Sequence, residues 1–245
     1  MTGYRDFAAP EGVRIRGTVL VLPGRGESQA GYGRFGARLA ADAYQVRVLP
    51  PSTDLSVADA ALKEAVSSID LVRPLVLAGA DTGAAVIAAL VAQSSPEKAW
   101  WPDAVVLAGL PGYDGRQGGG RDEELDLRTH CPVHRGVLTD DPAVVPGSLA
   151  EAAPAALLDA AYGSTADVPH LLLTGDADPL ADHAELNRLA KSLPQARLAV
   201  VRGGHHDVLN DLQHRSVAAE IVTFLEAVRG GVPPVPLVEV VATAW

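Results

Sequence analysis

Three short segments of the sequence place reactive side chains directly after apolar runs. In the first, Asp81 lies in Gly-Ala-Asp-Thr-Gly, between the run LVLAG and the helical pattern TGAAVIAAL. The glycine spacing is that of a G-x-S-x-G turn, in which small residues let a strand and a helix approach closely and the central side chain projects. A carboxylate there would stay ionised, because the helix dipole and the first N–H groups stabilise an anion. Asp81 is therefore a candidate nucleophile in the place usual for serine.

An acidic group and an imidazole follow two later apolar runs. The segment LLLTGDADP offers Asp176 or Asp178, and the segment GGHHDVLND offers His205 or His206. The chain order is turn residue, then acid, then histidine. This order differs from those of the trypsin-like and subtilisin-like proteases, so the three segments predict another kind of triad.

Each of these residues also has a purely structural interpretation. Alone, Asp81 would be a good helix N-cap, worth ~1 kcal/mol. Asp178 precedes a proline, and Asp-Pro readily starts a helix. A single histidine near a helix start is often an ordinary capping or surface residue. The glycine spacing, the acid, the histidine and the chain order together favour a working site over a chain that has lost catalysis.

Positioning these groups requires strands that end at one edge of a sheet. Short β-branched runs alternate with amphipathic segments, which predicts an α/β fold with a mostly parallel central sheet flanked by helices. In such sheets ligands bind beyond the carboxyl ends of the strands. Strands are predicted at 18–23, 45–50, 74–79, 103–109, 170–175 and 196–201, and helices at 32–43, 57–69, 83–93, 181–192 and 208–229.

Two segments interrupt this alternation. Residues 114–167 are too long for a simple connection, which predicts a short lid or cap insertion with helices of its own. Residues 231–245, GVPPVPLVEVVATAW, form a proline-punctuated and then strand-like extension. Packing on the domain or on a second copy would explain it, so a homodimer is compatible with the sequence. We expect the whole chain, 1–245, to be a single domain.

From GTVLVLPGRGES to EIVTFLEAV, the sequence resembles the α/β-hydrolase superfamily, in particular its compact lipase and esterase branch. LPGRGES is similar to the H-G-x-G loop of that family, with Pro23 in place of histidine. The resemblance implies an oxyanion hole made by the backbone N–H groups of Arg25 and Thr82. The family's GxxDP and HxxxxE/D patterns imply Asp178 as the acid and His206 as the base.

The turn residue departs from that branch, which uses serine. Haloalkane dehalogenases, fluoroacetate dehalogenases and epoxide hydrolases use aspartate on the same fold. By this resemblance Asp81 would attack an sp³ carbon and form an alkyl ester, His206 would activate the water that cleaves it, and Asp178 would orient the imidazole. No metal or organic cofactor is required. Two alternatives stay open: an esterase, thioesterase or lactonase in which Asp81 and His206 activate water, and a non-catalytic small-molecule-binding protein.

The insertion contains the dense group RTHCPVHR at 128–135. A zinc site would need further ligands at suitable spacing, and Cys131 as a nucleophile would need its own turn and base. We expect Arg128, His134 and Arg135 to line the substrate pocket with Tyr113, the arginines meeting an anionic substrate group. The tryptophan or lid tyrosines that hold a halide or protonate an epoxide in the aspartate-using families have no clear counterpart, so the sequence does not identify the substrate.

Composition restricts the partners. A chain of 245 residues with 48% hydrophobic content can bury a large core. The net charge of −10 provides no basic surface for nucleic acid. The single cysteine excludes an internal disulfide, the polar start does not resemble a signal peptide, and no run reaches the roughly 18 apolar residues of a membrane span. We expect a cytoplasmic protein acting on a small molecule, without nucleic-acid or membrane partners.

Overall fold

Seven strands form one central sheet in the computed structural model, which describes residues 3–115, 119–232 and 235–238. The spatial order is β1-β3-β2-β4-β5-β6-β7; β1 is antiparallel to β3, and the other neighbouring pairs are parallel. The strands are β1 (Arg5–Phe7), β2 (Gly17–Leu22), β3 (Tyr44–Val48), β4 (Leu75–Ala80), β5 (Ala104–Ala108), β6 (His170–Gly175) and β7 (Ala196–Val201).

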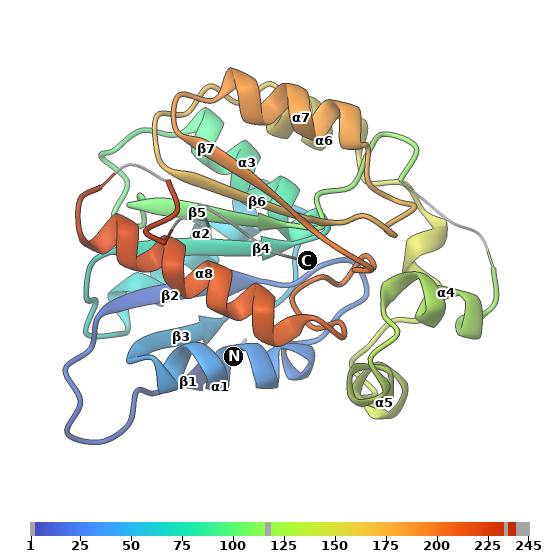
Figure 1. Cartoon of the computed structure of the whole chain (residues 1–245), viewed down its shortest axis with the longest axis horizontal. Coiled ribbons are helices and arrows are strands. Elements are labelled where there is room, and N and C mark those ends of the chain that lie inside the picture. Colours follow the sequence, from blue (N-terminus) through green and yellow to red (C-terminus); the bar gives the residue numbers. More distant parts are fainter. Residues whose placement is uncertain (1–2, 116–118, 233–234, 239–245) are drawn as a thin grey trace, which may run out of the picture.

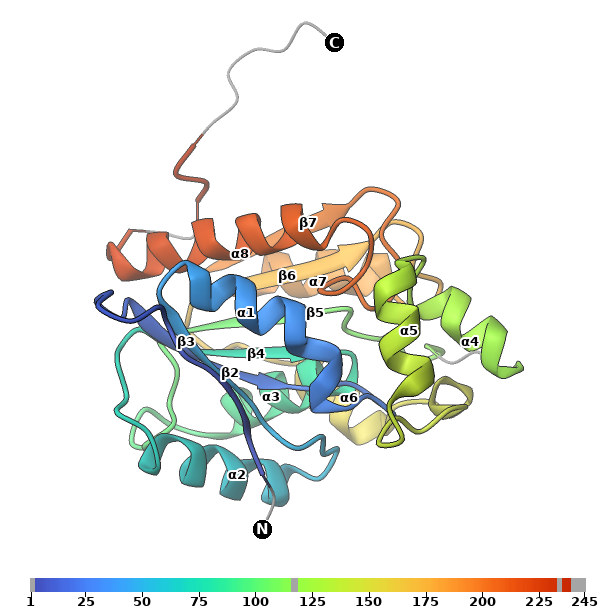
Figure 2. The same ribbon diagram turned by 90° about the horizontal axis from the view of Figure 1, so that it is seen from below.

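Helices cover both faces of the sheet (Figures 1 and 2). One face carries α2 (Leu55–Ser67), α3 (Thr82–Gln93), α6 (Ala155–Tyr162) and α7 (His183–Ser192), and the other carries α1 (Gly33–Ala41) and α8 (His214–Arg229). β2, β4, β5 and β6 are buried along their whole length. This is why they read as continuous apolar runs in the sequence and not as alternating patterns.

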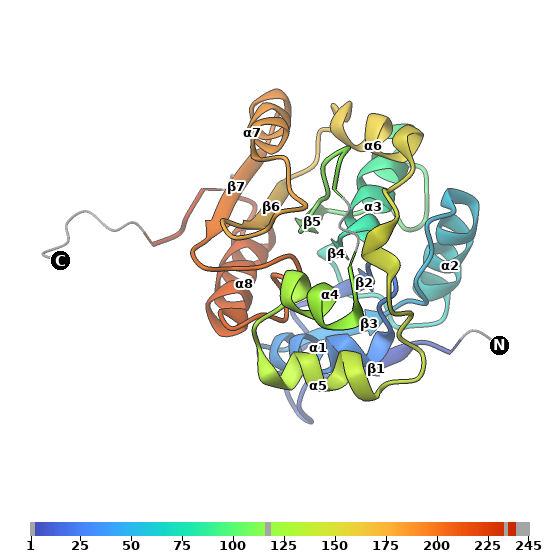
Figure 3. The same cartoon turned by 90° about the vertical axis from the view of Figure 1, so that its right-hand side faces the viewer.

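Two further helices, α4 (Arg121–Arg128) and α5 (Pro132–Asp140), lie over the carboxyl ends of the strands (Figures 1 and 3). They belong to the segment 114–167 that was predicted to form a cap, together with the short 3₁₀ helix η2 (Ser148–Ala150). α6 belongs to the same segment, but it packs against α3 and so extends the helical layer of the sheet. The part over the strand ends is therefore shorter than the predicted insertion.

The six predicted strands are all present, with ends that differ by no more than two residues. β1 was not predicted, because three residues carry too little pattern. The last helix was predicted from 208 but begins at His214. The intervening residues form a loop in which the Asp211 carboxylate accepts hydrogen bonds from Thr129 Oγ1 (2.8 Å) and the His205 N–H (2.8 Å), and these bonds replace helical ones.

The C-terminal extension is described only in part, since residues 233–234 and 239–245 lie outside the described residues. Within the described ranges, none of the helices combines the length and apolar character that crossing a lipid bilayer would require.

Candidate active site

Asp81 occupies a sharp turn between β4 and α3. Its backbone has φ 47° and ψ −123°, a conformation that L-residues adopt only under constraint. The flanking glycines explain the constraint: a Cβ on Gly79 would lie 2.5 Å from Ala84 N, and one on Gly83 would lie 2.3 Å from Leu22 O. These close backbone contacts explain why both residues that flank the turn must be small. The turn places the Asp81 side chain at the start of α3.

Asp81, His206 and Asp178 form a connected triad. His206 Nε2 lies 3.1 Å from Asp81 Oδ1, and His206 Nδ1 lies 2.9 Å from Asp178 Oδ2. All three side chains are buried. The two alternative residues lie apart from this line: Asp176 accepts a hydrogen bond from the Gly203 N–H at 2.6 Å, and His205 pairs with Asp211 at 2.9 Å. The geometry therefore selects Asp178 and His206.

The ionisation of the triad is set by opposing effects of burial and charge. Burial alone would lower the pKa of His206, but the charges and hydrogen bonds of Asp178 and Asp81 outweigh it and raise this pKa to about 10. Burial alone would raise the pKa of Asp81, but His206 and Arg25 hold this pKa well below its usual range. These two shifts favour an imidazolium at His206 beside an ionised Asp81 at neutral pH.

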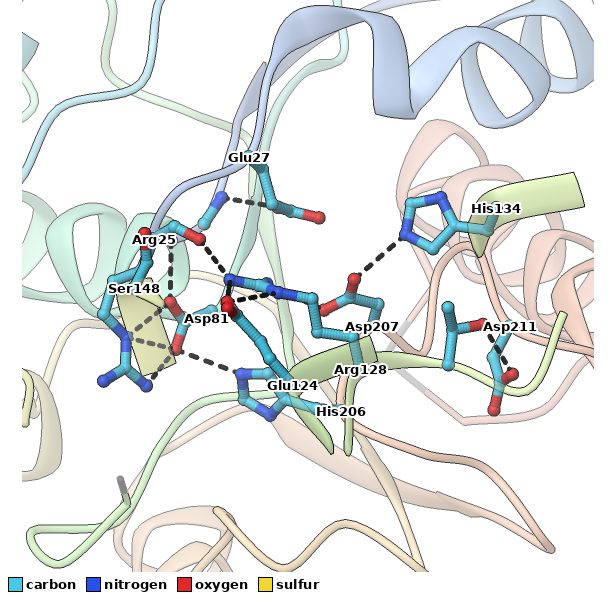
Figure 4. A network of polar contacts seen from close by, with 12 residues as sticks. Arg25, Glu27, Asp81, Glu124, Arg128, His134, Ser148, His206, Asp207 and Asp211 are labelled. Carbon is cyan, nitrogen blue, oxygen red and sulfur yellow. Dashed lines mark hydrogen bonds and ion pairs between the residues drawn. The ribbon is translucent and has the colours of Figure 1, made fainter. Parts of the chain in front are cut away.

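Arg25 binds Asp81 with both its backbone and its side chain (Figure 4). The backbone N–H donates to Oδ2 at 2.8 Å, which is the role expected of an oxyanion-hole donor holding one oxygen of the carboxylate. In addition, Nε donates to Oδ2 at 2.9 Å and Nη2 donates to Oδ1 at 2.8 Å. The second predicted donor, Thr82, begins α3, so its N–H has no acceptor within the helix.

The far side of the Arg25 guanidinium contacts backbone oxygens of the loops above it. Nη2 donates to Gly115 O at 3.1 Å, and Nη1 donates to Glu151 O. The side chain is only 8% exposed. The sequence motif pointed to the Arg25 backbone alone, because a loop motif does not reveal in which direction a long side chain turns.

A second buried network, the Arg128 cluster, consists of Glu27, Glu124, Arg128, His134 and Asp207 (Figure 4). Arg128 Nη2 and Nε donate to Glu124 Oε1 at 2.9 and 3.1 Å, and Nη1 lies 3.4 Å from Asp207 Oδ1. His134 Nε2 lies 2.9 Å from Asp207 Oδ2. Sequence reasoning missed all three acids, because acidic residues in loops and amphipathic helices are usually exposed.

The Arg128 cluster supports the active-site loop. Arg128 Nη2 donates to Arg25 O at 2.7 Å, and Glu27 Oε2 accepts a hydrogen bond from the Gly24 N–H at 2.7 Å. The backbone of Asp207, the residue after the triad histidine, donates to Arg128 O at 2.8 Å. The cluster thus ties α4 to the loops that carry Arg25 and His206.

Three members of the cluster present possible metal ligands. One ligand atom each of Glu27, His134 and Asp207 lies within 4.8 Å of the others. The guanidinium of Arg128 lies 3.4 Å from Asp207, so it already compensates this carboxylate and would repel a divalent cation. The pKa of Glu27 is raised by burial and by the nearby Asp207, which further weakens it as a ligand.

A surface cavity of about 420 Å³ opens beside Arg25. It is lined by Arg25, Thr82, Thr53 and residues of the segment 145–154 that includes η2. Arg25 lines this cavity, and its guanidinium contacts Asp81. Any ligand that approaches Asp81 from this cavity must therefore meet Arg25 first.

None of the four residues expected to line the substrate pocket lines this cavity. Arg128 and His134 turn inward to buried carboxylates, where charged groups find partners in place of water. Arg135 pairs with Asp126 at the surface, 2.5 Å away. Tyr113 donates a hydrogen bond to Asp159 at 2.8 Å.

Several solved structures have a fold similar to that of this chain. A monoacylglycerol lipase of Paleococcus ferrophilus superposes with a TM-score of 0.74 over 94% of this chain and 99% of its own, at 16% identity. This is the α/β-hydrolase fold. A soluble variant of the Saccharomyces cerevisiae monoglyceride lipase covers 92% of this chain and 91% of its own, with a TM-score of 0.68 and 15% identity.

Other matches extend the range of chemistry found on this α/β-hydrolase fold. A type II thioesterase from the yersiniabactin pathway has a TM-score of 0.62 and 17% identity, covering 92% of this chain and 98% of its own. A family model described as TAP-like protein matches residues 148–234. No curated protein sequence matches the chain. The predicted α/β-hydrolase fold is therefore confirmed, and the solved structures that share it include two lipases and a thioesterase.

Proposed function

We propose that the chain is a cofactor-independent hydrolase of a small organic substrate, with Asp81 as a nucleophile that forms an alkyl ester. The observation that carries this proposal is the geometry of the triad, in which His206 Nε2 lies 3.1 Å from Asp81 Oδ1 and His206 Nδ1 lies 2.9 Å from Asp178 Oδ2. Asp81 is held as an anion, and His206 has a pKa raised to about 10. An anionic carboxylate is ready to attack carbon, whereas a protonated imidazole is not ready to activate water.

In the first step one Asp81 oxygen attacks a carbon that bears a leaving group or belongs to a strained ring. The new C–O bond forms as the bond to the leaving group breaks with its electron pair. The Arg25 N–H holds Oδ2 at 2.8 Å, and this contact orients the carboxylate for attack by Oδ1. The reaction removes the negative charge of Asp81.

Loss of that charge prepares the second step. Asp81 is one of the two carboxylates that raise the pKa of His206, so esterification lowers this pKa. His206 then releases its proton to solvent, accepts a proton from a water molecule, and the resulting hydroxide attacks the ester carbonyl. As the tetrahedral intermediate collapses, its acyl C–O bond breaks, the alcohol leaves with the proton held by His206, and the regenerated Asp81 carboxyl group gives its proton back to His206. Donors that held the carboxylate stabilise the tetrahedral oxyanion. Asp178, 2.9 Å from Nδ1, keeps the imidazole oriented throughout.

The decisive experiment follows the oxygen of water in a single turnover. Excess wild-type enzyme in ¹⁸O-water should incorporate the label into the Asp81 carboxylate, because hydroxide attacks the ester carbonyl of the enzyme. Direct activation of water by Asp81 and His206 would instead place all of the label in the product. A screen with epoxides, haloacids and esters would supply the substrate for this measurement.

A His206→Ala variant gives an independent test by intact mass. The alkyl ester should accumulate and map to Asp81, while His205→Ala, which changes the neighbouring imidazole outside the triad, should turn over without accumulation. Turnover by the wild type without any adduct in His206→Ala would contradict the covalent route and favour an esterase, thioesterase or lactonase mechanism.

A non-catalytic binding protein is a second candidate, and the Arg25 contact favours it. Both oxygens of Asp81 accept hydrogen bonds from the guanidinium, which lies between this carboxylate and the cavity. If Asp81→Ala and His206→Ala leave every detectable turnover unchanged, the binding function is the better description.

A further inference from the structure

We propose that Arg25 binds a carboxylate carried by the substrate, so that the ligand of this site is a small organic acid. The proposal rests on the hydrolase function above and adds a substrate class to it. It starts from the position of Arg25, whose side chain is 8% exposed and forms both a wall of the cavity and a cover over Asp81.

The two edges of the guanidinium have unequal partners. One edge, Nε and Nη2, faces the Asp81 carboxylate at 2.8 to 3.2 Å. The other edge, Nη1 and Nη2, is held by the backbone oxygens of Glu151 and Gly115. Neutral carbonyl oxygens are weaker acceptors than a carboxylate, and the planar fork of arginine fits a carboxylate in a bidentate manner. A ligand carboxylate can therefore replace these two oxygens and keep the buried cation paired.

Exchange of partners would also expose the nucleophile. Arg25 carries one charge and now neutralises Asp81; a second carboxylate on its outer edge would draw the guanidinium outward. Asp81 keeps the Arg25 N–H and His206 as donors, at 2.8 and 3.1 Å, so it stays ionised without the guanidinium. An uncharged ligand offers no such exchange, and the guanidinium would stay over Asp81. Selectivity for acids and access to the nucleophile thus have the same cause.

The rest of the cavity agrees with a small anion. Thr82 lies in the first turn of α3, whose N-terminus favours negative charge. Thr53 and Ser148 add hydroxyl groups to the wall. Glu151 is the one acidic residue of the lining, and it is exposed, so its carboxylate can turn toward water. Its charge opposes an anionic ligand weakly, which provides a second test.

Equilibrium binding tests the site without any chemistry. Propionate and its uncharged counterpart propionamide would be titrated calorimetrically at constant ionic strength into the wild type, Arg25→Gln, Arg25→Lys and Arg135→Gln. Propionate should bind the wild type and Arg135→Gln equally, and bind Arg25→Gln at least tenfold more weakly; Arg25→Lys should lie between, since it keeps the charge without the fork. Glu151→Gln should tighten propionate binding. Propionamide should bind none of them measurably.

Covalent trapping separates this proposal from the proposed function. His206→Ala would be treated with 2-bromopropionate and with 2-bromopropionamide; Asp81 should attack the bromine-bearing carbon of the acid, bromide leaving with the electron pair, and should spare the amide. If propionate does not bind, or binds Arg25→Gln as well as the wild type, the carboxylate site is wrong, and an adduct from the amide would still support Asp81 as nucleophile. If propionate binds through Arg25 but neither bromide forms an adduct, the organic-acid site stands and the nucleophilic function falls.

Discussion

Arg25 and Arg128 are two buried arginines in adjacent parts of the same polar interior, and they are held in different ways. Arg128 is 3% exposed and contacts carboxylates on two sides, Glu124 and Asp207. Arg25 is 8% exposed and contacts one carboxylate, Asp81, while backbone oxygens occupy its other edge next to a cavity. Arg128 is already paired with carboxylates on two sides, whereas Arg25 could exchange the neutral backbone oxygens on its outer edge for a ligand carboxylate.

This difference indicates which of the two arginines forms an ion pair that can take part in function. A buried pair costs desolvation free energy, and it is retained where it fixes a structure or prepares a reactive group. The Arg128 pairs join α4 to the active-site loop, which is a structural task. The Arg25 pair favours the ionised form of Asp81, the proposed nucleophile, and Arg25 also lines a cavity. Substitutions of the two carboxylate partners should therefore change different properties.

The largest effect is expected for Asp81→Asn. Loss of the proposed nucleophile should lower kcat by about a thousandfold or more, as removal of a triad member does elsewhere. The matched change in the Arg128 cluster, Asp207→Asn, should lower the unfolding free energy and leave kcat within tenfold. Steady-state kinetics and urea denaturation of both variants measure the two outcomes. Equal losses of kcat in the two variants would show that the Arg128 cluster contributes to catalysis as much as Asp81 does.

The next largest effect concerns stability. Arg128→Met should lower the unfolding free energy by about 3 to 5 kcal/mol, because it leaves two buried carboxylates without their cation. Arg25→Met should cost less, because His206 remains as a cation 3.1 Å from Asp81. Urea denaturation gives both values. A larger loss in Arg25→Met than in Arg128→Met would reverse the roles that the structure gives to the two arginines.

The same contrast explains how much of the site could be predicted from sequence. The spacing of Gly79, Asp81 and Gly83 encodes backbone contacts within one turn, so the motif predicts the turn correctly. Asp178 and His206 follow strand ends, and the parallel sheet brings strand ends together at one edge. These features depend on local pattern and on topology, both of which the sequence carries.

The Arg128 cluster could not be predicted, because its members come from α4, α5 and two loops that are far apart in the sequence, and no motif links them. Arg128 was expected in the pocket because a cation beside a predicted site suggests ligand binding. Its actual direction is decided by Glu124, one helical turn earlier, and by Asp207, which is close only in the folded chain. Long-range pairing of buried charges is a property of the packed core and leaves no local signal.

A smaller effect is expected from pH. The folded-state pKa of His206 is about 10 against an ordinary value near 6.5, so its contribution to stability is complete below about pH 6.5 and is lost as the pH rises through 10. Between pH 7 and 9 this loss should be about 2 to 3 kcal/mol, because each pH unit contributes at most ~1.4 kcal/mol. Urea denaturation across this range measures it. In Asp81→Asn the slope should be shallower, because one of the carboxylates that raise the pKa is gone; an unchanged slope would contradict the assigned cause.

The smallest effect is expected where the same ion-pair chemistry lies at the surface. Arg135 and Asp126 are 30% and 64% exposed, so water and salt screen their attraction and the free side chains already have hydration. Arg135→Ala should change the unfolding free energy by no more than about 0.5 kcal/mol and leave kcat/KM unaltered. Denaturation and kinetics beside the Arg25 and Arg128 variants provide this baseline. A fall in kcat/KM for Arg135→Ala would show that Arg135 does contact the substrate. The contrast between Arg25 and Arg128 would then fail too, because it assumes that only an arginine beside the cavity acts on the ligand.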